Sequence, residues 1–164
     1  MPAKRRRAST HRGVGRLTAL LVVLGVAAGG AWASAQEKRY PIFTAEHFVS
    51  AMKTVGQAFV AVNASLGRNE FEDSKAYLVI SRDRLATTIT FWRDRKKDDA
   101  IKMLRDTVAK MDDLDVALSA AKIDPAAVAA RVKQIGASCE ACHAIYREQD
   151  PVTKAYKLKA GTAE

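Results

Sequence analysis

Residues 44–67 read TAEHFVSAMKTVGQAFVAVNASLG, and this stretch decides the fold class of the chain. Its large apolar side chains recur at alternating spacings of four and three residues: Phe48, Met52, Val55, Phe59, Val62 and Leu66. Such spacing places them along one face of an α-helix. Thr44 is a suitable N-cap and Gly67 a suitable stop, so we expect a helix over about 44–66.

A second and a third helix follow from the same kind of pattern. Large apolar residues recur every seven positions at Phe71, Leu78, Leu85 and Trp92, which predicts a helix over about 73–93 with Asp73 or Ser74 as its cap. One helix from 73 to 120 would be about 70 Å long, which exceeds a compact domain of this size. We therefore expect a break in the charged run at 94–98 and a third helix over about 98–121.

The fourth helix has the clearest start. Asp124 is a good N-cap, and Pro125 suits the first helical position because it needs no backbone partner. Apolar residues continue to Tyr146, Pro151 is expected to stop the helix, and residues 154–164 are expected to form a polar and disordered tail. No strand alternation is evident. The predicted fold is therefore all-α, an antiparallel up-down bundle of four helices over residues 36–153.

The first 35 residues have the pattern of a secretory signal peptide. Six basic residues precede an uncharged run from Leu17 to Ala35, and Ala33-Ser34-Ala35 fits a cleavage site. An uncleaved membrane anchor is the alternative, because this run is about as long as a bilayer span. These residues hold six of the 27 basic side chains and none of the 18 acidic ones, so residues 36–164 carry a net charge of only +3. The basicity is thus no argument for nucleic-acid binding.

The chemistry of the chain is concentrated in Cys139-Glu140-Ala141-Cys142-His143. Two thiols and an imidazole in the pattern C-x-x-C-H are typical of covalent attachment of one haem c. On a helix, Cys139, Cys142 and His143 share one face, so one macrocycle can meet all three. The same thiols could instead serve a thiol–disulfide enzyme or a zinc site, but the former usually lies in a βαβ setting and the latter needs four ligands.

Met52 is the candidate for the opposite side of the iron. The first and last helices of an up-down bundle are adjacent and antiparallel. Met52 lies about 12 Å along the first helix, and His143 lies about 9 Å from the end of the last, so the two fall at similar height. Met/His ligation of haem iron raises its reduction potential. From spacing alone, however, a Met on an apolar seam is more often a core residue.

Two segments resemble the cytochrome c′ family. Residues 135–147, IGASCEACHAIYR, are similar to its haem-binding helix, and residues 52–56, MKTVG, are similar to its segment on the distal side of the haem. The resemblance implies a four-helix bundle with covalent haem, His143 as the proximal ligand and Arg147 near the proximal face. A solvated Arg147 at the helix terminus is the alternative. It also implies the low-spin branch of the family, because Met52 stands where high-spin members often have Leu. Phe48 stands where those members often carry an Arg near a haem propionate.

These features predict a periplasmic mono-haem c-type cytochrome that carries single electrons between redox partner proteins and is not an enzyme. The alternative is a high-spin cytochrome c′ that binds NO or CO at an open distal site. The two differ in the bond from Met52 to iron. The resemblance further implies a homodimer through the first two helices. An uncleaved signal would make the protein membrane-anchored and facing the periplasm.

Overall fold

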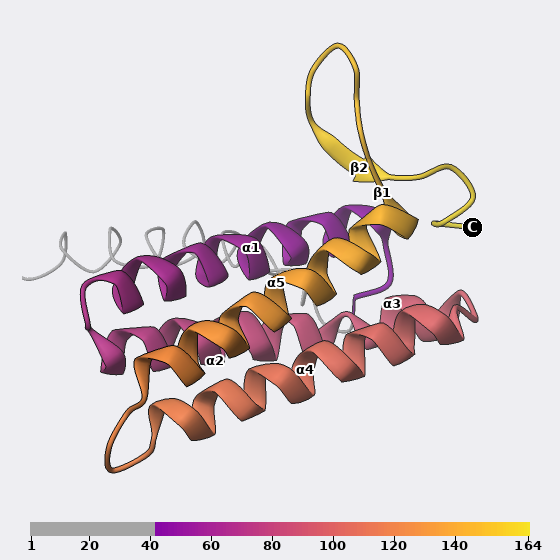
Figure 1. Cartoon of the computed structure of the whole chain (residues 1–164). Coiled ribbons are helices and arrows are strands. Elements are labelled where there is room, and N and C mark those ends of the chain that lie inside the picture. The colour runs from indigo at the N-terminus through magenta and orange to yellow at the C-terminus, as the bar shows by residue number, and fades with distance from the viewer. Residues whose placement is uncertain (1–41) are drawn as a thin grey trace, which may run out of the picture. The chain divides into compact units, whose positions relative to one another are not determined.

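The computed structural model describes residues 42–164, which form five helices followed by a two-stranded sheet (Figure 1). The helices are α1 (Ala45–Gly67), α2 (Phe71–Thr87), α3 (Ile89–Asp94), α4 (Asp98–Leu118) and α5 (Pro125–Tyr146). The strands β1 (Arg147–Gln149) and β2 (Tyr156–Leu158) pair antiparallel, with Glu148 opposite Lys157. This mostly helical content confirms the expected all-α class. The predicted signal peptide and its alternative as an anchor lie outside the described residues.

Helix α1 begins as expected and ends slightly later. The Thr44 side chain accepts a hydrogen bond from the backbone N–H of His47 at 3.1 Å, which confirms the predicted cap. Gly67 is still helical, however, and the chain turns at Asn69, which has a φ of 60°. Asn tolerates this left-handed conformation because its short polar side chain can bond locally. Gly67 is therefore not the stop that the sequence suggested.

The second predicted helix is divided in two. It begins at Phe71, before the predicted caps, and breaks at Thr88 into α2 and the short α3. At the break, the Thr88 hydroxyl and the Thr88 N–H both donate to the Leu85 carbonyl, at 2.7 and 3.0 Å. Threonine hydroxyls that bond to carbonyls in this way compete with the regular helical ladder. The single helix predicted over 73–93 is wrong at this point.

The other two helix boundaries largely follow the sequence. The expected break at 94–98 is confirmed, because α3 ends at Asp94 and Lys96 adopts a φ of 54° before α4 begins. The Asp124 side chain accepts from the N–H groups of Ala126 and Ala127, at 2.9 and 3.3 Å, and Pro125 opens α5. Both features of the α5 start are as predicted.

The long helices pack in chain order and successive ones run in opposite directions (Figure 1). The principal helix contacts are α1 with α2, α2 with α4, and α4 with α5, whereas the backbones of α1 and α5 make few or no close approaches. The α1–α2 pair is joined by the Ser81 hydroxyl, which donates to the Val55 carbonyl at 3.1 Å and is fully buried. The margin between α1 and α5 is thus the loosest side of the helical body.

The buried face of α1 differs from the predicted seam. Phe48, Val55 and Val62 are buried as expected, but their buried companions are small: Ala51, Ala58 and Ser65. Met52, Phe59 and Leu66 form a second row at seven-residue spacing that is only partly buried and packs against the core. Met52 therefore lies at the margin of the core rather than within it.

The C-terminal residues are structured, so the expected disordered tail is wrong. Helix α5 ends at Tyr146, well before Pro151, and Arg147 continues as extended chain with φ −114° and ψ 141°. Residues 147–158 form the β-hairpin, closed by a hydrogen bond from Asp150 N–H to the Ala155 carbonyl at 2.8 Å. Thr162 is buried beyond it. Two three-residue strands rich in charged side chains give almost no alternating signal in the sequence.

Candidate functional site

The two cysteines occupy the part of α5 that faces the core. Cys139 and Cys142 are free thiols, each partly buried, and both pack against the hydrophobic core. His143 is also partly buried and follows directly. Over α5 only Val128, Ile135 and Tyr146 are buried, so the helix face between Ile135 and Tyr146 is incompletely covered. The structure thus brings the C-x-x-C-H residues to one half-open surface of a helix.

Both thiols are held in the protonated form. Burial raises the pKa of Cys142 to about 11, and the neighbouring Cys139 and the Asp99 carboxylate add to this rise. Burial also raises the pKa of Cys139, against a smaller lowering by the Arg147 charge. Catalytic thiols of disulfide oxidoreductases have a lowered pKa instead. The environment of Cys139 and Cys142 therefore differs from that of a redox-active C-x-x-C.

The imidazole of His143 is kept neutral by its surroundings. Burial lowers its pKa, and the positive charge of Arg147 lowers it further, while Glu140 opposes this effect. A neutral imidazole has a free ring nitrogen, and this is the form of His that binds metal ions. The site thus combines two S–H groups and one neutral imidazole on adjacent positions.

Arg147 lies beside these groups, where α5 gives way to β1. Its charge lowers the pKa of both Cys139 and His143, so it is close to the candidate site. Its guanidinium lies over the ring of Tyr156 in β2, 4.1 Å from the centroid. Arg147 therefore contacts the hairpin through Tyr156 and also lies near Cys139 and His143, so it is not a freely solvated residue at the helix end.

Met52 belongs to the opposite wall of this margin. It lies on α1, is partly buried and packs against the same core as Cys139 and Cys142. Phe48, one turn earlier, is buried in an aromatic cluster with Phe91, Trp92 and Tyr146. The predicted distal and proximal residues thus border one core from two helices whose backbones do not pack closely.

Glycines flank both candidate ligands, and neither glycine is needed for close helix packing. A Cβ added to Gly56, one turn after Met52, would meet no atom within 4 Å, and the same holds for Gly136, one turn before Cys139. Close approach of a neighbouring helix is therefore excluded as the reason for either glycine. Space for a flat group at this margin is compatible with both positions.

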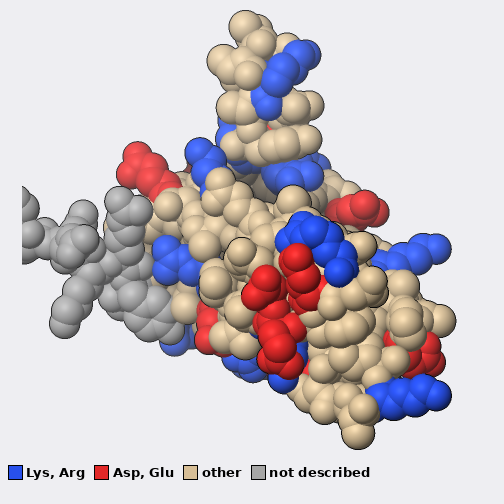
Figure 2. All heavy atoms as spheres, turned by 90° about the vertical axis from the view of Figure 1, so that its left-hand side faces the viewer, with Lys and Arg blue, Asp and Glu red and all other residues tan. Residues whose placement is uncertain are grey.

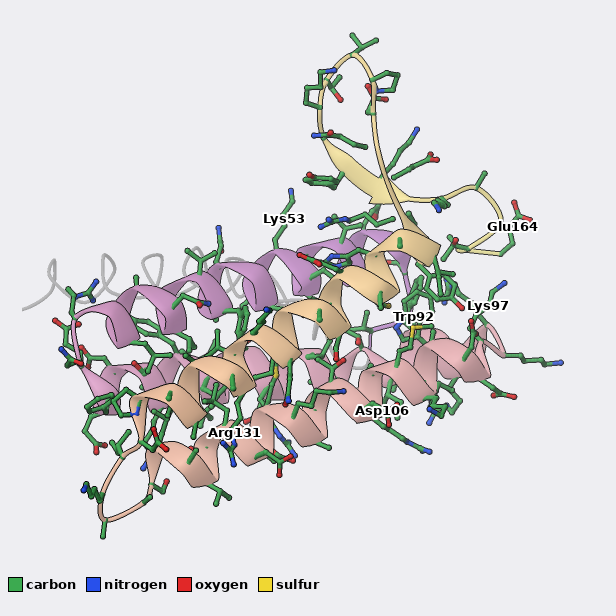
Figure 3. The ribbon with its side chains drawn as sticks, viewed as in Figure 1. Lys53, Trp92, Lys97, Asp106, Arg131 and Glu164 are labelled. Carbon is green, nitrogen blue, oxygen red and sulfur yellow. The ribbon has the colours of Figure 1, made fainter. Side chains whose placement is uncertain are left out.

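Asp99 is a residue of the site that no sequence pattern indicates. The Tyr146 hydroxyl donates to the Asp99 carboxylate at 2.5 Å, and the Tyr146 ring lies 4.7 Å from that of Trp92. Trp92 points into the helical body near the end of α5 (Figure 3). Asp99 belongs to a charged run that is expected to be solvated, and only the folded chain brings it to Tyr146 and Cys142.

No protein-family model, curated protein or solved structure matches this chain. Within residues 42–164, no three His, Cys, Asp or Glu side chains are clustered so that they could hold a metal ion. An iron already held by four porphyrin nitrogens takes only one or two ligands from the protein. In the same part of the chain, no helix is long and apolar enough to cross a membrane.

Charged side chains are interspersed over the visible surface. On the face shown in Figure 2, Lys and Arg lie among Asp and Glu. Elsewhere along the helices, Arg82 forms a bidentate pair with Asp112 at 2.8 and 3.2 Å. This mixture agrees with the low net charge of residues 36–164.

Proposed function

We propose that this protein is a periplasmic c-type cytochrome that carries single electrons on one covalently bound haem. The observation that carries the proposal is the placement of Cys139, Cys142 and His143. They form one half-open helix face, with protonated thiols and a neutral imidazole, in a mostly helical chain. We further propose that the helices form the up-down bundle of the cytochrome c′ family, to which the two segments named above are similar.

The thiols of Cys139 and Cys142 would hold the haem through two thioether bonds. Each S–H would add across one vinyl group of the porphyrin, the sulfur to one carbon and the hydrogen to the other, so no oxidant would be required. The spacing of three residues puts both sulfurs on one side of α5. Their incomplete burial leaves room for this attachment, and a Cβ added to Gly136 in the adjoining turn would meet no atom within 4 Å.

His143 and Met52 would be the two axial ligands from the protein. His143 offers its neutral imidazole from α5, and Met52 offers a thioether from α1 across the margin at which the two helices are not closely packed. Bound there, the haem supplies a one-electron Fe(III)/Fe(II) couple. If both residues held the iron, no open site would remain on it for a substrate, and this favours electron transfer over catalysis.

Export agrees with this chemistry. The predicted signal in residues 1–35 would deliver the chain to the periplasm, and thioether formation would consume both cysteines of the protein there. The redox partners would then be other periplasmic or membrane-bound electron carriers.

The test is an absorption spectrum of the protein produced in a host that matures c-type haem, in both redox states and with carbon monoxide. We expect a low-spin spectrum, a far-red band from Met sulfur when oxidised, and no rapid binding of carbon monoxide. Covalent haem with an open, carbon monoxide-binding iron would favour the gas-binding alternative. Absence of covalent haem would rule out both the electron carrier and the gas-binding alternative.

Met52→Leu tests the distal ligand separately. This change removes the sulfur and preserves most of the side-chain volume. We expect loss of the far-red band and rapid binding of carbon monoxide. Met103→Leu is the matched control, because Met103 also lies partly buried at the edge of the core but on α4. If M52L and M103L have the same spectrum as the wild type, Met52 is not a ligand.

A further inference from the structure

The β-hairpin at residues 147–158 is anchored to the last turn of α5. The final carbonyls of a helix have no partner within the helix. Here the Lys159 side chain donates to the Ala144 carbonyl at 2.6 Å, and the Lys159 N–H donates to the Tyr146 carbonyl at 3.0 Å. A positive charge at a helix C-terminus also interacts favourably with the helix dipole. Lys159 therefore holds the end of α5, one turn beyond Cys142 and His143.

The same hairpin also reaches α1. Strand β2 contacts α1, and Leu158 packs against the core. The backbones of α1 and α5 themselves have few or no close approaches. Strand β2 is therefore one of the few direct links between α1 and the arm formed by α5 and β1. An open groove of about 620 Å³ remains between the first turns of α1 and residues 156–164, and Lys53 extends from α1 on the hairpin side (Figure 3).

The hairpin has internal supports that fix its direction. The Arg147 guanidinium lies over the Tyr156 ring. In the ladder between β1 and β2, Glu148 lies opposite Lys157. At the turn, the Asp150 side chain accepts hydrogen bonds from the N–H groups of Val152 and Thr153. The chain after the hairpin is also held, because the Arg95 side chain donates to the Ala163 carbonyl at 3.0 Å. A hairpin tied at both ends can transmit a fixed spacing between the elements it joins.

We infer that the hairpin is a positioning element that sets the spacing between α1 and α5, and so holds Met52 at binding distance from an iron carried by His143. The inference rests on the proposed function and extends it. In the proposed cytochrome, ligation of Met52 depends on the spacing between two helices whose backbones make few or no close approaches. The hairpin adds a direct link between them. It would thereby favour an iron held by both His143 and Met52, as in an electron carrier, over an iron that is open to small gases.

Lys159→Met tests this role in the haem-loaded protein. The change keeps a long side chain but removes the hydrogen bond to Ala144 and the charge. We expect a weaker far-red Met band and carbon monoxide binding at least tenfold faster than in the wild type. Lys159→Arg, which keeps a donor and the charge, should restore most of the wild-type behaviour.

Lys157→Met is the matched control on the same strand. It also removes one positive charge, but within residues 42–164 the exposed Lys157 side chain forms ion pairs with Glu148 and Asp150, at 3.4 and 3.9 Å, and none with α5. We expect K157M to keep the wild-type spectrum. If K159M and K157M both keep the spectrum and the carbon monoxide kinetics of the wild type, the inference is overturned while the proposed function stands.

A second measurement does not need haem. Amide hydrogen exchange on the purified full chain without haem reports how firmly the last turn of α5 is held. We expect faster exchange at residues 143–146 in K159M than in K157M. Equal exchange in both variants would overturn the inference even if the chain were found to bind no haem.

Discussion

At the scale of single residues, Tyr146 joins the candidate site to the start of α4. It is 8% exposed, its ring packs against Trp92, and its hydroxyl donates to Asp99. This hydrogen bond is the main cause of the lowered pKa of Asp99, while burial and Asp99 together raise the pKa of Tyr146. Asp99 itself is exposed, so solvent screening limits the strength of the interaction.

Tyr146→Phe removes this hydrogen bond without changing the ring. We expect the free energy of unfolding to fall by about 1 kcal/mol at pH 7, which is less than is usual for a bond to a charged group because Asp99 is exposed. The folded state lowers the pKa of Asp99, so the stabilisation is present above its ordinary value of 3.8 and is lost as the pH falls below that value. Urea unfolding at pH 7 and at pH 3 should therefore show a smaller difference between wild type and Y146F at pH 3.

Tyr77→Phe is the control for that measurement. Tyr77 is on α2, is 39% exposed, and its hydroxyl makes no hydrogen bond within residues 42–164. We expect it to leave stability unchanged at both pH values. A Y146F variant as stable as Y77F at pH 7 would contradict the role assigned to the bond with Asp99.

At the scale of elements, small side chains explain how α1 and α2 pack. Ala51, Ala58 and Ser65 recur every seven residues on α1, and Ser74, Ser81 and Thr88 do so along α2 and its end. All six are buried. Small residues let two helix backbones approach, and the buried bond from Ser81 to the Val55 carbonyl shows that this happens. The small side chains at this interface thus allow α1 and α2 to pack closely.

Ala58→Leu tests the packing of these small residues between α1 and α2. A larger side chain in a well-packed interface forces the helices apart, which typically costs about 1–3 kcal/mol of stability. Ala64→Leu on the same helix is the matched control, because Ala64 is exposed and Leu is a good helix former. Thermal and urea unfolding of the two variants measure the difference. Equal stability of A58L and A64L would mean that the α1–α2 interface can accommodate a leucine at position 58 and is not closely packed there.

The helices and the hairpin differ in how far the sequence could predict them. Signals carried by a few adjacent residues, such as the cap at Asp124 with Pro125 or the apolar row starting at Phe48, led to correct helices. The break at Thr88 depends on a hydroxyl that could bond either way, and no Gly or Pro marks it. The hairpin was missed because its strands are short and are stabilised by partners on α1 and α5.

At the scale of the whole described domain, the same distinction applies to the candidate site. The C-x-x-C-H is local in sequence, so the shared face of Cys139, Cys142 and His143 was predictable from helix geometry alone. Asp99 and the hairpin come from distant segments, and their approach to the site depends on the complete fold. Ligation by Met52 stays a prediction, because it depends on the spacing between two helices.

Arg95 ties together the ends of the described chain. It lies in the short connection between α3 and α4, and its guanidinium donates to the carbonyls of Phe43, Phe91 and Ala163 at 3.1, 3.2 and 3.0 Å. It also lies over the Phe91 ring, 3.7 Å from the centroid. One side chain thus links the segment before α1, the aromatic cluster and the C-terminal residues.

Arg95→Gln should loosen both ends at once. The loss of three charge-assisted bonds and of the contact with Phe91 should lower the free energy of unfolding by about 1–2 kcal/mol. It should also increase carboxypeptidase trimming of residues 159–164, since Ala163 loses its partner. Arg93→Gln is the control, because within residues 42–164 the Arg93 side chain bonds only to its exposed neighbour Asp94 at 3.5 Å. If R95Q is trimmed no faster than R93Q, the C-terminal segment is held by the hairpin and Thr162 alone, and Arg95 is not the link between the two ends.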